Sequence, residues 1–201
     1  MRCEKLLKEI IKPGLKVFYG PAASGKTNLM LYFLKQFCRD DKCIYVSTEG
    51  LDFLKRGIEI GLNIAKIIVL EALDLLDLLN IIEEHVDEII SSKIAVIDSI
   101  NAGYRRQASE KHSFELFNYI LAKLRMIAEK YKANILCTSQ VHEYAEGLEA
   151  VGMKAINLWA SSIFRVIRDD KGRLIMLEKP STLQFTARFS IVKGGIVWES
   201  C

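Results

Sequence analysis

The chain has 201 residues, of which 50% are hydrophobic and 26% are charged, and its formal net charge is +3. This length and balance suit one α/β domain, so we expect residues 1–201 to form a single unit with a sizeable core. The apolar runs are interrupted by charges and the N-terminus lacks a signal-peptide pattern, which excludes a membrane span and predicts a cytoplasmic protein without a membrane partner.

Short apolar stretches and amphipathic segments alternate along most of the chain. We predict strands over Leu15–Tyr19, Cys43–Ser47, Lys66–Leu70, Ile94–Ile97 and Ala133–Thr138. Apolar residues at helical spacing predict helices over Asn28–Phe37, Leu51–Ile60, Leu75–Ile90 and Ser113–Lys130. This alternation predicts an α/β fold, with a mainly parallel sheet and helices on both of its faces.

The pattern changes near the C-terminus. Ile163–Arg168 and Arg173–Lys179 are typical of the two strands of a hairpin, joined by the turn Asp169–Gly172. Gln184–Val192 and Ile196–Trp198 add further strand signals. We therefore expect a C-terminal antiparallel extension of the sheet.

A glycine-rich loop joins the first predicted strand to the first predicted helix. Its residues match the phosphate-binding pattern G-x-x-x-x-G-K-[ST] without a gap. The two glycines allow backbone amides to point at phosphates, and the helix N-terminus favours an anion. Lys26 would reach the β- and γ-phosphates of ATP, and the Thr27 hydroxyl would bind Mg²⁺. The predicted nucleotide-binding residues are Gly20, Pro21, Ala22, Ala23, Ser24, Gly25, Lys26, Thr27 and Asn28.

Three more polar residues follow predicted strands, at the sheet edge where α/β proteins bind ligands. Asp98 is placed to hold Mg²⁺ through water, although an aspartate at this position also suits a helix cap. Glu49 is placed to orient and deprotonate an attacking water, or it is an exposed loop residue. Gln140 is placed to sense the γ-phosphate, or it is a surface amide.

Four stretches of the sequence together resemble the RecA/RadA recombinase family. They are KPGLKVFYGPAASGKT, IYVSTEG, IAVIDSINAGYRR and ILCTSQVH, in the family's order and at similar separations. The resemblance covers Lys12 to Trp198 and is greatest to the short archaeal RadA paralogues of the RadB type. It implies a RecA-like P-loop NTPase core, in which the Gln140 strand lies between the P-loop strand and the Asp98 strand.

The resemblance also implies roles for the residues that match. Lys26 and Glu49 become catalytic, with Glu49 as the base, and Gln140 becomes the γ-phosphate sensor. Val141–Lys154 takes the place of a second DNA-binding loop. Lys179 with Pro180 resembles a cap segment that approaches ATP, sometimes from a neighbouring subunit.

Several basic and aromatic residues are candidate DNA contacts. They are Tyr104, Arg105, Arg106 and Tyr144, with a further basic group on the C-terminal hairpin at Arg165, Arg168, Lys171, Arg173 and Arg188. Basic side chains suit phosphate and tyrosines suit stacking on bases. Isolated surface charges and loop packing remain the alternatives.

The resemblance implies an ATP-dependent DNA-binding accessory protein that modulates homologous recombination and DNA repair, with slow Mg²⁺-dependent, DNA-stimulated ATP hydrolysis. Expected partners are single-stranded DNA and the main RadA-type recombinase or other repair proteins; the oligomeric state stays open. The chain shows no helix-hairpin-helix domain or Phe-x-x-Ala motif before the core, and Val141–Lys154 is short and acidic, which favours an accessory role. A KaiC-like signalling ATPase without DNA binding and a non-hydrolysing partner of the recombinase are the alternatives.

The five cysteines match no zinc-site spacing. Cys38 and Cys43 flank a predicted helix-to-strand turn. Two unrelated thiols are the simpler expectation, and a disulfide between them is the alternative.

Overall fold

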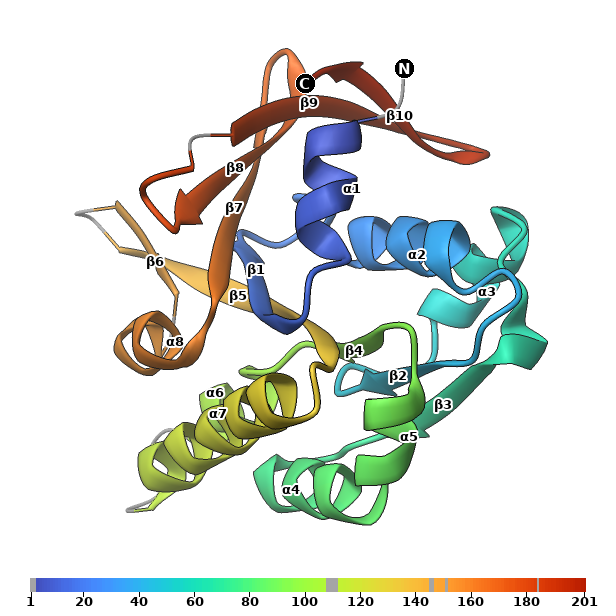
Figure 1. Cartoon of the computed structure of the whole chain (residues 1–201). Coiled ribbons are helices and arrows are strands. Elements are labelled where there is room, and N and C mark those ends of the chain that lie inside the picture. The colour runs from blue at the N-terminus through green and yellow to red at the C-terminus, as the bar shows by residue number, and fades with distance from the viewer. Residues whose placement is uncertain (1–2, 108–111, 145–146, 151, 184) are drawn as a thin grey trace.

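The fold is known from a computed structural model that describes residues 3–107, 112–144, 147–150, 152–183 and 185–201. In this part of the chain the strands form one sheet, in the order β10-β9-β8-β7-β1-β5-β4-β2-β3, and β6 pairs with β5 (Figure 1). The parallel centre consists of β1 (Gly14–Gly20), β2 (Cys43–Ser47), β3 (Ile67–Glu71), β4 (Ala95–Asp98) and β5 (Asn134–Tyr144). β1, β2 and β4 are buried along their whole length, as expected for parallel strands covered on both faces.

The strand order places four strand ends beside one another. β5 lies between β1 and β4, as the family resemblance implied. The register pairs Gly20 with Gln140 and Ser47 with Asp98. Because parallel strands end at the same edge, the residues that follow β1, β2, β4 and β5 meet there.

Helices cover both faces of this sheet (Figure 1). One face is covered by α1 (Glu4–Ile10), α2 (Lys26–Phe37) and α3 (Phe53–Glu59). The opposite face is covered by α4 (Leu75–Glu84), α5 (Val86–Ser91), α7 (Ser113–Lys130) and α8 (Met153–Trp159). Val17 and Phe18 enter opposite cores because successive side chains alternate across a strand.

Several helical segments differ from the sequence-based prediction. The predicted helix Leu75–Ile90 is interrupted at His85, whose ψ of 26° leaves the helical region, so α4 ends there and α5 begins. The apolar period continued across this break because both helices bury residues in the same core. α1 and the short α6 (Ala102–Arg106) were not predicted, and a 3-10 turn covers Ile64–Lys66.

β5 also extends beyond its predicted end at Thr138. Its last residues pair with β6 (Gly147–Ala150), with Val141 opposite Ala150 and Tyr144 opposite Gly147. The segment expected as a loop therefore holds the backbone of a hairpin and the start of α8 in its described residues. Pairing between the two halves of the segment, rather than a local strand signal, lengthens β5.

The C-terminal strands form the predicted antiparallel extension. They are β7 (Ser162–Asp169), β8 (Gly172–Lys179), β9 (Phe185–Val192) and β10 (Gly195–Ser200). β7 joins the central sheet by parallel pairing with β1, in which Lys16 lies opposite Ser162. Gln184, where a strand was expected to begin, lies outside the described residues.

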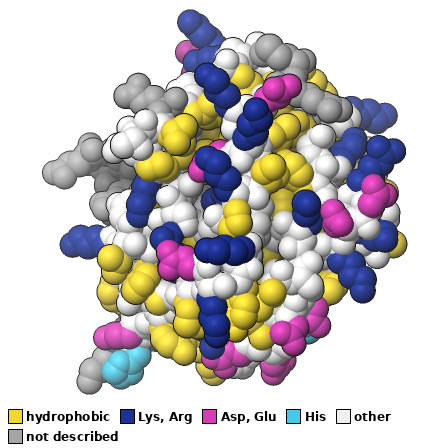
Figure 2. Space-filling model, viewed as in Figure 1, with side chains coloured by type: hydrophobic (Ala, Val, Ile, Leu, Met, Phe, Trp, Pro, Cys, Tyr) yellow, Lys and Arg dark blue, Asp and Glu magenta, His cyan; other side chains and the backbone are white. Residues whose placement is uncertain are grey.

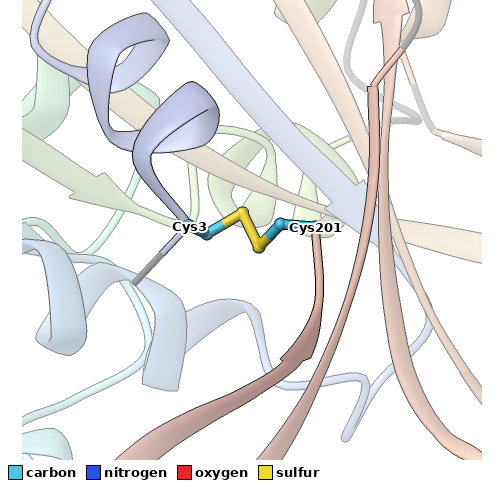
Figure 3. Close-up of a disulfide and its surroundings, with 2 residues drawn as sticks. All are labelled: Cys3 and Cys201. Carbon is cyan, nitrogen blue, oxygen red and sulfur yellow. A yellow bond between two sulfur atoms is a disulfide. The ribbon is translucent and has the colours of Figure 1, made fainter. Parts of the chain in front are cut away.

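Four of the five cysteines are paired. Cys38 bonds Cys43 with their Cα atoms 5.9 Å apart, so the expectation of two unrelated thiols is wrong. Cys3 bonds Cys201 with a Cα–Cα distance of 5.6 Å, and this bond ties the start of α1 to the end of β10 (Figure 3). Sequence spacing gave no signal for the second bond, because only folding brings these segments together. Cys137 is free and buried.

No helix in the described part of the chain combines the length and apolar character that crossing a bilayer requires.

Candidate functional site

A cavity of about 390 Å³ opens at the carboxyl ends of β1, β2, β4 and β5. Its lining includes the predicted residues Ala22, Ala23, Gly25, Lys26, Thr27, Asn28, Glu49, Asp98 and Gln140. Four further lining residues were not predicted for this site: Ser99, Thr138, Arg173 and Ile191. The fold thus brings the phosphate loop, two carboxylates and an amide from distant parts of the sequence to one cavity.

The two glycines of the phosphate loop are required for different reasons. Gly25 has φ of +104°, a conformation that side chains disfavour, and it caps the N-terminus of α2. A Cβ atom on Gly20 would lie 1.9 Å from the backbone oxygen of Val166. Gly20 is therefore needed for close packing against β7, whereas the sequence had suggested backbone freedom at both positions.

Lys26 is nine-tenths buried at the start of α2. Its Nζ donates to the backbone oxygens of Gly20, at 2.8 Å, and Pro21, at 2.7 Å. Burial lowers the pKa of Lys26 to about 8, while the nearby carboxylates of Asp98 and Glu49 act in the opposite direction. Nζ also donates to the Ser24 hydroxyl at 3.4 Å, so among the described residues the hydrogen-bond acceptors of this ammonium are all neutral groups.

Asp98 is fixed from two sides at the end of β4. Its Oδ2 accepts a 2.6 Å hydrogen bond from the Tyr45 hydroxyl, and its Oδ1 accepts from the Thr138 hydroxyl. Burial and the Asp98 charge raise the pKa of Tyr45, so Tyr45 remains a donor at neutral pH. The carboxylate is thereby held in one orientation at the cavity wall.

The side chains of Thr27 and Asp98 line the same cavity and fit a magnesium site. Mg²⁺ beside phosphates is held by one or two protein groups, with phosphate oxygens and waters as its other ligands. Among the described residues, no group of three His, Cys, Asp or Glu side chains forms a dedicated metal site. A hydroxyl and a fixed carboxylate beside a phosphate loop are the donor set that Mg²⁺ needs.

Glu49, Gln140 and Arg105 form a cluster at the far side of the cavity. Glu49 Oε1 accepts from Gln140 Nε2 at 2.7 Å and from Ser99 Oγ at 3.3 Å, and Arg105 Nη2 lies 3.9 Å from it. Arg105 Nη1 also donates to the Gln140 side-chain oxygen. The cluster orients the Glu49 carboxylate and links it to α6.

The side chain of Asn101 makes two hydrogen bonds with the backbone of Gln140. Its side chain donates to the Gln140 backbone oxygen at 2.8 Å and accepts from the Gln140 amide at 3.0 Å. Sequence reasoning overlooked Asn101, because an asparagine between a strand and a short helix has many other uses. The end of β5 is thereby held against the segment after β4.

Comparisons with known proteins find similarity along nearly the whole chain. No protein-family model matches the chain. DNA repair and recombination protein RadB of Methanocaldococcus jannaschii is 29% identical over 208 residues, covering 95% of this chain and 98% of the relative. RadB of Methanosphaera stadtmanae is 28% identical over 214 residues, covering 96% and 92%. A crystal structure of the RadB recombinase matches with a TM-score of 0.74 at 25% identity, over 92% of this chain and 91% of that one.

The chain is similar to RadB, a RecA/RadA-like recombinase paralogue, over nearly its whole length. The structural match to RadB extends over the mainly parallel sheet and the antiparallel C-terminal strands. The fold expected from the sequence is therefore confirmed.

Three of the candidate DNA residues, Tyr104, Arg105 and Arg106, have contacts within the protein. Tyr104 stacks on Phe117 with ring centroids 4.9 Å apart. Arg106 donates to the backbone oxygen of Leu73 at 2.5 Å, and Arg105 belongs to the Glu49 cluster. The side chain of Tyr144 lies outside the described part of the structure.

The basic residues of the C-terminal hairpin have different partners, so they do not act as one group. Arg188 pairs with Asp169 at 2.7 Å and Arg165 lies 4.0 Å from Glu178, whereas Arg173 lines the cavity beside the phosphate loop. Figure 2 shows Lys and Arg side chains spread over one face of the molecule rather than gathered in one patch.

The expected cap segment does not line the cavity of its own chain. Lys179 Nζ donates to the Asn157 backbone oxygen at 2.6 Å, so its side chain contacts α8 and does not line the cavity.

Proposed function

We propose that this chain is an ATP-dependent accessory protein of homologous recombination and DNA repair. The observation that carries the proposal is one cavity in which phosphate-loop residues, among them Lys26 and Thr27, meet Asp98, Glu49 and Gln140. The relatives that support it are named DNA repair and recombination proteins. Its expected partners are single-stranded DNA and the main RadA-type recombinase.

The phosphate loop would bind the triphosphate of ATP. Loop amides and the N-terminus of α2 attract the anion, and Lys26 would exchange the Gly20 and Pro21 carbonyls for phosphate oxygens. Thr27 and Asp98 would hold Mg²⁺, which when bound offsets the charge of the phosphates.

Glu49 would act on the attacking water. Its carboxylate is held by the Gln140 amide and the Ser99 hydroxyl, which fixes the direction in which it can accept a proton. Arg105, 3.9 Å away, partly offsets its charge. Constrained in this way, the base supports slow hydrolysis of ATP to ADP and phosphate.

Arg173 would be an additional nucleotide ligand from the same chain. Its side chain approaches the loop so closely that a Cβ on Gly25 would lie 3.0 Å from the Arg173 Cδ. Its Nε atom is buried and has no hydrogen-bond partner among the described residues. A guanidinium beside a phosphate loop suits a phosphate or ribose oxygen.

ATP would influence DNA binding through β5. Gln140 lies where β5 leaves the cavity and continues toward β6. The resemblance to recombinases assigns this segment to a DNA-binding loop. A γ-phosphate that contacts Gln140 would bias the position of this hairpin.

The decisive experiment is the ATPase rate with and without single-stranded DNA, at two salt concentrations, for the wild type and Lys26→Ala. The proposal expects a slow Mg²⁺-dependent rate, stimulated by DNA most strongly at low salt and absent in the variant. Equal rates in Lys26→Ala would reject the site. Hydrolysis that DNA leaves unchanged, with no salt-sensitive DNA binding, would favour a signalling ATPase instead.

A further inference from the structure

A second hollow lies between α1 and the strands β7, β8 and β9, and it shares no lining residue with the nucleotide cavity. It holds about 310 Å³, at the lower end of the roughly 300–1,000 Å³ of ligand sites. Its lining consists of Lys5, Leu6, Lys8, Glu9, Lys12, Phe164, Leu177, Leu183 and Phe185. Hereafter this set is the α1 groove.

The floor of the α1 groove is apolar. Leu6, Phe164 and Leu177 are buried and form its base. Leu183, at the edge, leaves 48% of its surface exposed. An apolar side chain of a partner would cover this surface, at roughly 25 cal/mol for each Å² removed from water.

The rim of the α1 groove is basic. Lys5 and Lys8 are three residues apart and lie along one side of α1, and Lys12 follows the end of the helix at the same rim of the groove. Lys12 pairs with Glu9 at 2.5 Å, but Lys5 and Lys8 are exposed, and neither has an acidic partner among the described residues. Figure 2 shows basic side chains beside hydrophobic ones over the region of α1.

The wall of the groove is held in place. The disulfide between Cys3 and Cys201 anchors the start of α1 (Figure 3), and Asn134 Nδ2 donates to the Ile10 backbone oxygen at 2.8 Å near its end. A groove fixed at both ends of its helix loses little conformational entropy when it binds a partner.

We propose that the α1 groove binds an acidic peptide segment of a partner protein. One bulky apolar side chain of the peptide enters the hollow over Leu183, and flanking carboxylates contact Lys5 and Lys8. An apolar pocket for one side chain beside two unpaired cations matches such a peptide better than a nucleic acid, which needs a longer basic track and stacking surfaces.

The test uses a short fluorescein-labelled peptide in which aspartates and glutamates flank a central Leu-Phe pair. Fluorescence anisotropy should detect salt-sensitive binding to the wild-type chain. Lys5→Glu/Lys8→Glu should weaken binding by at least about tenfold. Leu183→Ser should also weaken it, whereas the matched charge reversal Lys42→Glu/Lys93→Glu should not.

Two further probes separate the alternatives. A peptide with serines in place of Leu-Phe should bind less tightly, and labelled oligo-dT should bind with an affinity that Lys5→Glu/Lys8→Glu leaves unchanged. Equal binding of both peptides, equal binding to the variant, or no binding at all would overturn the proposal. A loss of oligo-dT binding in the variant, without a loss of peptide binding, would assign the groove to nucleic acid. Nucleotide binding by the variants serves as the folding control and is independent of the outcome.

Discussion

The side-chain amide of Gln140 donates a 2.7 Å hydrogen bond to Oε1 of Glu49, although the two residues are 91 positions apart in the chain. Gln140 ends the cavity portion of β5, and Glu49 follows β2. Since Arg105 contacts both side chains, three separate segments meet at the proposed water-activating carboxylate. A substitution in this cluster would therefore affect both the proposed hydrolysis of ATP and the β5–β6 hairpin.

Glu49→Gln should retain ATP binding and lose turnover. The amide is isosteric but cannot accept the proton of the attacking water, so we expect the rate to fall by roughly 10²–10⁴-fold. Calorimetry would measure affinity and a phosphate-release assay would measure turnover. Glu84→Gln, an exposed change on α4, is the control and should behave as wild type. Normal hydrolysis by Glu49→Gln would place the base elsewhere.

Gln140→Ala should separate ATP binding from the DNA response. The change removes the hydrogen bonds to Glu49 and Arg105, whereas both Asn101 bonds use backbone atoms of residue 140 and remain. We expect unchanged nucleotide affinity and loss of ATP-dependent DNA binding. Anisotropy with labelled single-stranded DNA, with and without a non-hydrolysable ATP analogue, measures this, and exposed Gln36→Ala is the control. An intact ATP effect in Gln140→Ala would contradict the coupling.

Arg173→Ala should weaken nucleotide binding. A charge-assisted hydrogen bond contributes about 1.5–3 kcal/mol, so the dissociation constant should rise roughly tenfold to a hundredfold. Arg168→Ala removes an exposed arginine from the neighbouring strand and should have no effect on affinity. If Arg173→Ala binds nucleotide normally while Lys26→Ala does not, the phosphate site stands and the Arg173 contact is rejected.

Nucleotide affinity should depend on pH through Lys26. Burial places the pKa of Lys26 at about 8 in the free protein, and a bound phosphate would raise it. Below that pH Lys26 is protonated in both the free and the nucleotide-bound protein, so the affinity for nucleotide should be constant. Above it, binding takes up a proton, and the dissociation constant should approach a rise of about tenfold per pH unit. Titration calorimetry in buffers of different ionisation enthalpy would detect this proton uptake; a constant affinity above that pH would count against it.

Cys3→Ser should lower thermal stability. The disulfide to Cys201 closes a loop of nearly the whole chain, so its loss should cost about 3–5 kcal/mol, or roughly 10 °C in Tm. Cys201→Ser opens the same loop and should have the same effect, and the double variant should be no worse than either. Differential scanning calorimetry measures all three. Additive losses would mean that the cysteines act separately.

The sequence predicted the parts of the fold that depend on local pattern. Sequence analysis predicted the gapless phosphate loop, the helix Ser113–Lys130 and the strand Cys43–Ser47 correctly. It could do so because a motif and the spacing of apolar residues are both encoded in neighbouring positions. The break at His85 was not predicted, because the spacing of apolar residues continues unchanged across it. The extension of β5 was not predicted either, because it depends on pairing with another strand, β6.

By itself, the sequence determined the order of the parallel strands and of the main helices between them, the phosphate loop, and the positions of Asp98, Glu49 and Gln140 after strands. Only the tertiary structure decided that Arg173 reaches the loop, that Arg105 joins Glu49 and Gln140, and that Cys3 bonds Cys201. The first set follows from periodicity and short-range stereochemistry, which neighbouring residues encode. The second depends on how strands far apart in the chain pair, and this is fixed by the burial of two cores around one sheet.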